Sequence, residues 1–168
     1  MAGCVRGAEA SLLRRLGWLA GLLWASPNTA LGLVAGLAGM FAGARPRLSR
    51  RDGALVFAAY PWGPGGALTL GNVILATGPD LDGPCLGYAH RAGWCRLPPV
   101  RLGDHERAHV LQYLVLGPLF LPLYFACGGV SAHNRFEQAA DCYAHTGHGW
   151  WPWPRPRPPY SRGPEHDA

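Results

Sequence analysis

One short stretch, HERAH at positions 105–109, contains the residue types that activate water on a metal ion. His105 and His109 are four positions apart, so on a helix both side chains project from one face and can reach a single ion. Glu106 would lie beside that ion, where a carboxylate can take a proton from water. The pattern is typical of a zinc hydrolase, and the alternative is a pair of surface histidines on an amphipathic helix.

A third ligand is expected from NRFEQAAD at positions 134–141. Glu137 and Asp141 are again four positions apart on a predicted helix. One of the two carboxylates could bind the metal, while the other accepts a hydrogen bond from a ligating histidine and fixes its tautomer. Three nearby histidines remain open as replacements for Glu137, namely His133, His145 and His148.

His-Glu-x-x-His followed by Glu-x-x-x-Asp resembles the gluzincin class of zinc peptidases, the thermolysin-like group. This resemblance implies a zincin-like fold and assigns a role to each residue. Zn²⁺ would be held by His105, His109 and Glu137, with Glu106 as the general base and Asp141 as a supporting residue. A gluzincin also has a Tyr or His that stabilises the tetrahedral oxyanion, and the candidates here, by proximity in sequence, are Tyr143 and His133.

A second resemblance covers roughly residues 54–144. HERAHVLQY, GPLFLP at 117–122 and NRFEQAAD are similar to a family of small uncharacterised bacterial membrane proteins with HExxHxxQ, GPLxLP and an Ex(x)AD-type ending. This resemblance implies a membrane protein that is predicted to be a peptidase. It names no substrate.

The site residues must be positioned by two helices and by a pair of strands before them. The metal helix is predicted over 104–116, with Asp104 as its N-cap, and the second ligand helix over 134–144. ALVFAAY at 54–60 and ALTLGNVILA at 67–76 are rich in β-formers and predict one β-hairpin over 54–76. An edge strand beside the site could hold an extended peptide, or the strands could only cover the helix.

An almost uncharged run over 16–44 is long enough to cross a bilayer. Ser26-Pro27 predicts a break, so one short helix would end near Ala25 and another would run from Pro27 to Gly43. The second helix contains Gly-x-x-x-Gly twice, a spacing that lets another helix approach closely in lipid. A cleaved signal peptide is the alternative, but the apolar character continues past the candidate cleavage point, which favours retention in the membrane.

Arginines stand on both sides of this apolar run, at 14 and 15 before it and at 45, 47, 50 and 51 after it. Because positive loops stay cytoplasmic, this distribution favours a re-entrant hairpin or interfacial pair of helices over one kinked span, with the cytoplasmic face favoured for the site. The second resemblance implies that the membrane is the inner membrane of a bacterium. A second apolar segment, 114–130, is interrupted by Gly117-Pro118 and Pro122. It is expected to dip into the bilayer and return, or to form a buried hairpin of short helices.

Composition bounds the remaining possibilities. Only 15% of the 168 residues are charged, so much of the surface is expected to face something other than water. The net charge of +5 does not predict nucleic-acid binding, because the arginines flank apolar segments, and lipid head groups are the expected partner. Cys85 and Cys95 could form a disulfide in an oxidising compartment. A zinc site there is not predicted, because Cys-x-x-Cys pairing is absent and His90 lacks a matching partner.

The sequence therefore predicts a small α+β domain over 11–148, mainly helical with one β-hairpin and membrane-associated, between a disordered segment 1–10 and a disordered Pro/Trp/Arg tail 149–168. Three functions are compatible with it. They are a zinc metallopeptidase acting on peptides or membrane proteins, an inactive protein stabilised by zinc, and a membrane interaction protein with a chance HExxH motif. Oligomeric state is not predicted.

Overall fold

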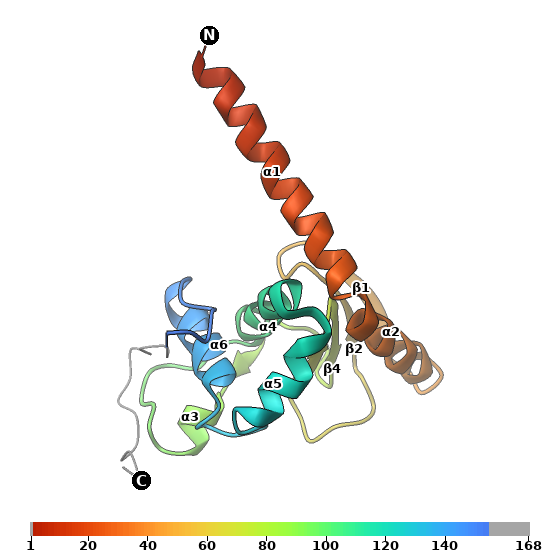
Figure 1. Cartoon of the computed structure of the whole chain (residues 1–168). Helices are drawn as coiled ribbons and strands as arrows, with labels where there is room; N and C mark the ends of the chain where they lie inside the picture. The colour runs from red at the N-terminus through yellow and green to blue at the C-terminus, as the bar shows by residue number, and fades with distance from the viewer. Residues whose placement is uncertain (1, 155–168) are drawn as a thin grey trace.

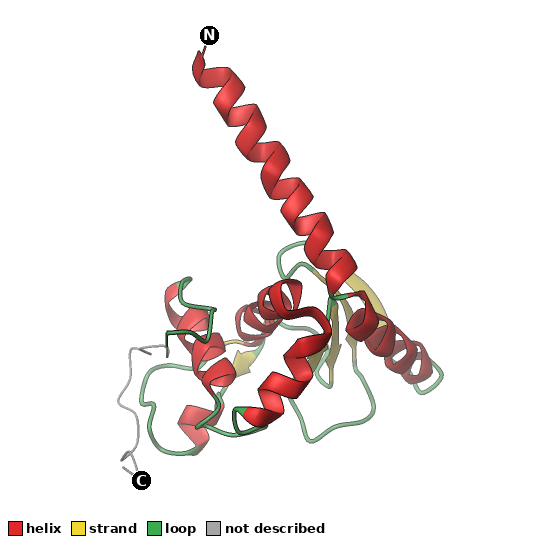
Figure 2. Cartoon of the chain, in the orientation of Figure 1, coloured by secondary structure: helices red, strands yellow, loops and turns green. Residues whose placement is uncertain are grey.

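The fold is mixed α+β, as the sequence predicts, and helices outweigh strands (Figure 1, Figure 2). The computed structural model describes residues 2–154, with side chains at 11, 13 and from 15 onward. The helices are α1 (Ala2–Trp24), α2 (Ser26–Met40), α3 (Tyr88–Arg91), α4 (Leu102–Leu116), α5 (Phe120–Ala126) and α6 (Arg135–Thr146), with a 3-10 turn η1 (Gly117–Leu119). The strands are β1 (Arg45–Ser49), β2 (Ala54–Ala58), β3 (Ala67–Leu70), β4 (Val73–Ala76), β5 (Pro84–Cys85) and β6 (Val100–Arg101).

Four strands form one sheet in the order β1-β2-β4-β3, and β5 pairs with β6 separately. Strands β3 and β4 are an antiparallel hairpin turned at Gly71-Asn72, where Gly71 has a φ of +61°. Strand β2 pairs with β4 in parallel, with Val56 opposite Ile74. The hairpin predicted between 54–60 and 67–76 was therefore wrong. The hairpin lies within 67–76, because the Gly-Asn turn divides that run into two short strands.

Both faces of the sheet are covered, which explains why its central strands are apolar along their whole length. Val56 and Ile74 pack against Val110 of α4 on one face. Phe57 and Val73 belong to a separate buried cluster on the other face, toward α2. Helix α4 and helix α2 therefore lie on opposite sides of the sheet, as Figure 1 shows.

Helix α2 approaches the sheet through its glycines. A Cβ atom at Gly36 would lie 2.3 Å from the ring of Phe57, and one at Gly32 would lie 2.7 Å from Cβ of Val73. The glycine face predicted to receive another helix in lipid is thus occupied by the sheet of the same chain. The glycines are needed there because a side chain on this face of α2 would fill the space that the Phe57 ring occupies.

The apolar run at the start of the chain breaks where Ser26-Pro27 predicts. The axes of Arg15–Trp24 and Ser26–Met40 differ by 65°, and α1 extends away from the rest of the molecule (Figure 1). Residues 2–10, which the sequence analysis predicts to be disordered, continue α1 in the structure.

Helix α4 begins at Leu102, so Asp104 lies in its first turn, and the N-cap is Arg101 instead of the predicted Asp104. The helix ends at Leu116, and the next residue, Gly117, has a φ of +54° and starts the break in the 114–130 segment. The stretch Leu102–Ala126, with 25 residues, is long and apolar enough to cross a membrane. Half of its most apolar 18-residue part is buried inside the protein. Core helices of soluble proteins share these properties.

The chain after α6 folds back onto the helices. The side-chain amide of Gln112 donates to the carbonyl of Trp150 at 2.7 Å, Pro152 is buried, and the Trp153 ring lies 5.4 Å from that of Phe136. The disordered tail predicted from 149 was therefore wrong for 149–154, because these aromatic residues do have a core to join, around Phe136. The remainder of the predicted tail, 155–168, lies outside the described residues.

A buried ion pair fixes the start of α4 to the turn between β1 and β2. The guanidinium of Arg101 donates to both carboxylate oxygens of Asp52, at 2.7 and 3.2 Å. Burial raises the pKa of Asp52, but the hydrogen bonds from Arg101 and Ser49 and the charge of Arg101 outweigh it, so the pKa lies below its ordinary value. Asp82 and Asp104 contact the same guanidinium from more exposed positions.

We expect Asp52→Asn to lower the free energy of unfolding by about 3 kcal/mol at pH 7, because removing one partner strands the charge of the other. Since the folded pKa lies below the unfolded one, the Asp52 contribution is complete above about pH 4 and is lost as the pH falls through the folded pKa. The deficit of the variant in urea unfolding should therefore shrink at acid pH.

The matched control is Asp82→Asn, which removes an exposed carboxylate from the same guanidinium. Its effect on urea unfolding should be much smaller, because exposed ion pairs contribute little. Equal effects of the two substitutions would contradict the importance of the buried pair.

Candidate metal centre

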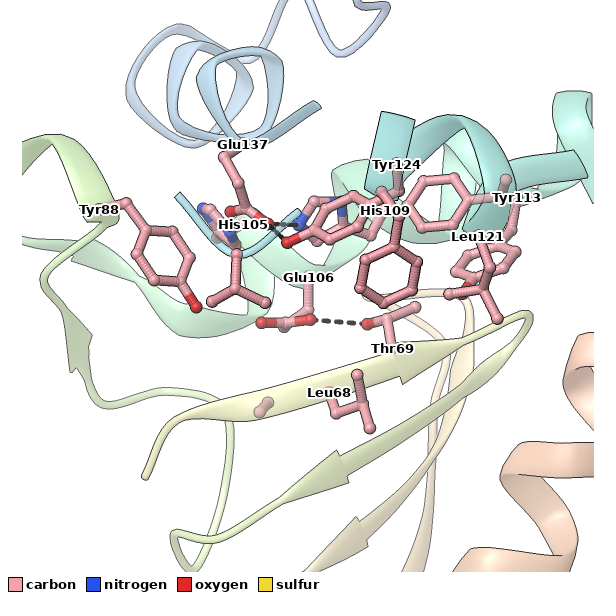
Figure 3. Close-up of a pocket in the computed structure, with 14 residues that line it drawn as sticks. Leu68, Thr69, Tyr88, His105, Glu106, His109, Tyr113, Leu121, Tyr124 and Glu137 are labelled. Carbon is pink, nitrogen blue, oxygen red and sulfur yellow. Dashed lines mark hydrogen bonds and ion pairs between the residues drawn. The ribbon is translucent and has the colours of Figure 1, made fainter. Parts of the chain in front are cut away.

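The three residues predicted as metal ligands meet where α4 packs on α6. His105 and His109 project from one face of α4, and Glu137 of α6 points toward them (Figure 3). One ligand atom from each residue lies within 4.8 Å of the others, and all three side chains are buried. The local sequence explains the arrangement, because Asn134 caps α6 by accepting a hydrogen bond from the Phe136 amide, which starts the helix just before Glu137.

The separations between the donor atoms fit a small cation. Nε2 of His105 lies 3.1 Å from Oε2 of Glu137, and Nε2 of His109 lies 3.5 Å from Oε1 of the same carboxylate. Two ligands that are each about 2.1 Å from a tetrahedral ion are about 3.4 Å apart. Both distances to Glu137 are therefore close to the spacing that Zn²⁺ requires, and two imidazoles with a carboxylate are ligands that Zn²⁺ accepts.

Asp141 determines the tautomer of His105. Its Oδ1 lies 3.0 Å from Nδ1 of His105, and because a carboxylate accepts, Nδ1 carries the proton and Nε2 is directed to the Glu137 side. This is the contact that the sequence predicts for a supporting carboxylate. Gly87 makes room for it, since a Cβ there would lie 2.3 Å from Oδ1 of Asp141.

Gln112 does the same for His109, a role that the sequence analysis did not assign. The amide nitrogen of Gln112 donates to the Trp150 carbonyl, so its oxygen faces His109 and lies 2.8 Å from Nδ1. That nitrogen must therefore donate, so Nε2 is the ring atom that faces Glu137 and that a metal would take. The available signal was spacing, because residues three apart share a helix face.

The electrostatics of the group favour a charged carboxylate. Burial raises the pKa of Glu137, but the charge of His109 and the hydrogen bonds from both histidines outweigh it and hold the pKa well below its usual range. Burial lowers the pKa of His105, yet the bonds to Asp141 and Glu137 raise it well above the ordinary value. A cation at this position would replace the proton that His105 otherwise shares with Glu137.

Glu106 lies beside these ligands and is not one of them. Its Oε2 accepts a hydrogen bond of 2.6 Å from Oγ1 of Thr69, on strand β3 (Figure 3). Both residues line a pocket between α4, α5 and β3, together with Leu68, Tyr88, Tyr113, Phe120, Leu121, Tyr124, Phe125, Val130 and the three ligands. Thr69 was missed by the sequence analysis, because only the folded sheet brings β3 over the metal helix.

Three tyrosines line the pocket, Tyr88, Tyr113 and Tyr124, and none of them was predicted to do so. The hydroxyl of Tyr124 donates to Oε1 of Glu137 at 2.5 Å. Tyr88 directs its hydroxyl toward the side of the pocket where Glu106 lies (Figure 3). The two residues predicted as oxyanion donors are not in the pocket lining, and His133 is exposed and packs edge-on against Trp94.

Comparisons with protein-family models, with curated proteins and with solved structures find no match for this chain. The family resemblance in the sequence therefore stays a prediction. What supports the metal centre is its geometry.

We expect His109→Ala to bind one zinc ion fewer per chain than the wild type, because two donors on separate helices cannot hold the ion against solvent. Elemental analysis of purified, dialysed protein measures the difference. His148→Ala removes an exposed histidine outside the group and is the matched control. Equal zinc content in wild type and His109→Ala would exclude His109 as a ligand.

Proposed function

We propose that this chain is a membrane-associated zinc metallopeptidase with a gluzincin-like centre. His105, His109 and Glu137 would bind Zn²⁺, and Glu106 would be the general base. The observation that carries the proposal is that ligand atoms of the three side chains lie within 4.8 Å of one another. Beside them Glu106, which is not one of the ligands, lines the same pocket.

The roles of the chain's own residues follow from their positions. A bound Zn²⁺ would supply a Lewis acid that polarises the scissile carbonyl and makes water more acidic. Glu106 would take a proton from the attacking water and pass it to the leaving amine. Thr69 holds one carboxylate oxygen of Glu106 at 2.6 Å, which fixes the orientation of the base.

Tyr88 is the best candidate for the donor that stabilises the oxyanion, in place of Tyr143 and His133. Its hydroxyl is directed toward the Glu106 side of the pocket (Figure 3), whereas that of Tyr124 is donated to Glu137. Burial, with the charge of Glu137, raises the pKa of Tyr88, so the phenol keeps the proton it would donate.

The substrate side of the pocket is formed by the edge strand β3. It ends the sheet order, so one of its edges pairs with β4 and the other is unpaired within residues 2–154. An extended peptide can add to such an edge by main-chain hydrogen bonds. Leu68, Leu121 and Phe125 make the pocket wall apolar, which favours a peptide with an apolar side chain near the cleaved bond. Extended segments of membrane proteins carry such apolar side chains and are the substrate class that we propose.

Membrane association is supported by the first two helices. Large apolar side chains are exposed along α1 and α2, among them Leu19, Leu23, Leu31, Val34, Leu37 and Met40. The exposed arginines 45, 47, 50 and 51 follow directly and suit anionic head groups on the cytoplasmic side. Helix α4 uses its apolar residues in the core, so we assign the lipid contact to α1 and α2.

The arrangement favours an enzyme over a protein that zinc merely stabilises. A catalytic zinc site needs an open position that faces a pocket, with a general base beside it. Three ligands are grouped here, and they line a pocket. A chance motif would not bring Glu137 and Asp141 of a separate helix to the same histidine.

Glu106→Gln is expected to keep its zinc and lose hydrolysis by a factor of about 10² or more, because the amide preserves shape but cannot take a proton. Hydrolysis would be measured in detergent with a panel of quenched-fluorescent peptides that carry apolar residues. Asp104→Asn, on the same helix but facing Arg51 and Arg101, is the control that should stay active. If wild type and Glu106→Gln hydrolyse the peptides equally while both bind zinc, only a structural role for the zinc would remain.

For the membrane contact, the wild-type protein should sediment with membranes and resist carbonate extraction. Val34→Asp combined with Leu37→Asp places two charges on the exposed face of α2 and should make the protein extractable. The control Leu86→Asp changes an exposed leucine outside α1 and α2. This variant should resist carbonate extraction as the wild type does. Recovery of the wild type as a soluble monomer would contradict the assignment.

A further inference from the structure

A second group of metal-ligand side chains lies one helical turn beyond Asp141. His90 of α3, Cys95 in the following loop and His145 in the last turn of α6 each offer one ligand atom within 4.8 Å of the others. The sequence analysis rejected a zinc site at 77–103 because His90 had no matching partner. That reasoning was wrong, because α6 supplies the partner, 55 positions later in the chain.

Local structure brings the first two residues together. The amides of Trp94 and Cys95 both donate to the carbonyl of Ala89, at 2.9 and 3.2 Å, and Gly93 reverses the chain with a φ of +75°. Cys95 is thereby folded back against the helix that carries His90. His145 follows Glu137 and Asp141 at intervals of four on α6, so one helix face serves both groups.

His90 is already oriented as a ligand. Its Nε2 lies 3.0 Å from the carbonyl oxygen of Leu97, and since a carbonyl only accepts, Nε2 carries the proton and Nδ1 carries the lone pair. Nδ1 is buried and receives no hydrogen bond from the described residues. A buried lone pair without a partner is costly, and metal coordination would satisfy it.

Cys95 supplies a donor that selects the type of metal. Its side chain is buried and is a free thiol, so the disulfide that the sequence allowed between Cys85 and Cys95 is not formed. One sulfur and two imidazole nitrogens are ligands for Zn²⁺ and not for Mg²⁺ or Ca²⁺, which require oxygen. Binding would release the thiol proton to solvent.

We propose that His90, Cys95 and His145 form a second Zn²⁺ site, which ties the segment between β5 and β6 to the end of α6. A water molecule would complete the coordination. The site would stabilise α3, and with it Gly87, against which Asp141 packs, and Tyr88, which lines the pocket. This inference does not depend on peptidase activity.

Cobalt substitution separates the two sites in the full-length protein. The first centre has only nitrogen and oxygen donors, so a sulfur-to-cobalt charge-transfer band in the near-ultraviolet reports the second centre alone. We expect this band in Co²⁺-loaded wild type and equally in His109→Ala, which leaves the second set of ligands unchanged. Cys95→Ser should abolish the band, and His145→Ala should weaken Co²⁺ binding at the second site by about 100-fold or more.

Cys85→Ser is the matched control, since Cys85, in β5, lies near His105 and outside the proposed ligand set. The band should persist in this variant. Wild type and His109→Ala both keep His90, Cys95 and His145. Absence of the band from both proteins would therefore overturn the proposal. Its persistence in Cys95→Ser would overturn it too. In elemental analysis, His109→Ala should retain one zinc ion per chain, bound at the second site. The double variant with both His109→Ala and Cys95→Ser should bind none. A zinc ion retained by the double variant would contradict the second site.

Discussion

The burial of the Glu137 carboxylate between α4 and α6 is the constraint on which the rest of this structure depends. A buried carboxylate is tolerated only with partners, and this one has Nε2 of His105 at 3.1 Å, Nε2 of His109 at 3.5 Å and the Tyr124 hydroxyl at 2.5 Å. Each partner is held in turn, because Asp141 orients His105 and Gln112 orients His109. The packing of α4 on α6 is therefore inseparable from the polar group between them.

The remaining elements position a pocket around this group. The sheet supports α4 from behind through Val56, Ile74 and Val110, and its edge strand brings Thr69 to Glu106. Helix α5 covers the opposite side of the pocket with Phe120 and Leu121. Much of the pocket wall is apolar, and an apolar wall strengthens the electrostatic interactions of the polar groups within it.

The sequence identified what is encoded locally. Spacing of four residues placed His105 with His109 and Glu137 with Asp141, and Ser26-Pro27 located a helix boundary, because each pattern acts within a turn or two of helix. Contacts between distant segments were not accessible. The parallel pairing of β2 with β4, the packing of Gly36 on Phe57, and the meeting of His90 with His145 depend on tertiary packing, which no short pattern expresses.

The most direct test of the account is anomalous diffraction at the zinc edge from crystals of the zinc-loaded protein. The account predicts an anomalous peak within about 2.0–2.2 Å of Nε2 of His105, Nε2 of His109 and a carboxylate oxygen of Glu137. The carboxylate of Glu106 should lie outside that coordination shell. No peak at this position, or a peak coordinated by Glu106 in place of Glu137, would contradict the central claim.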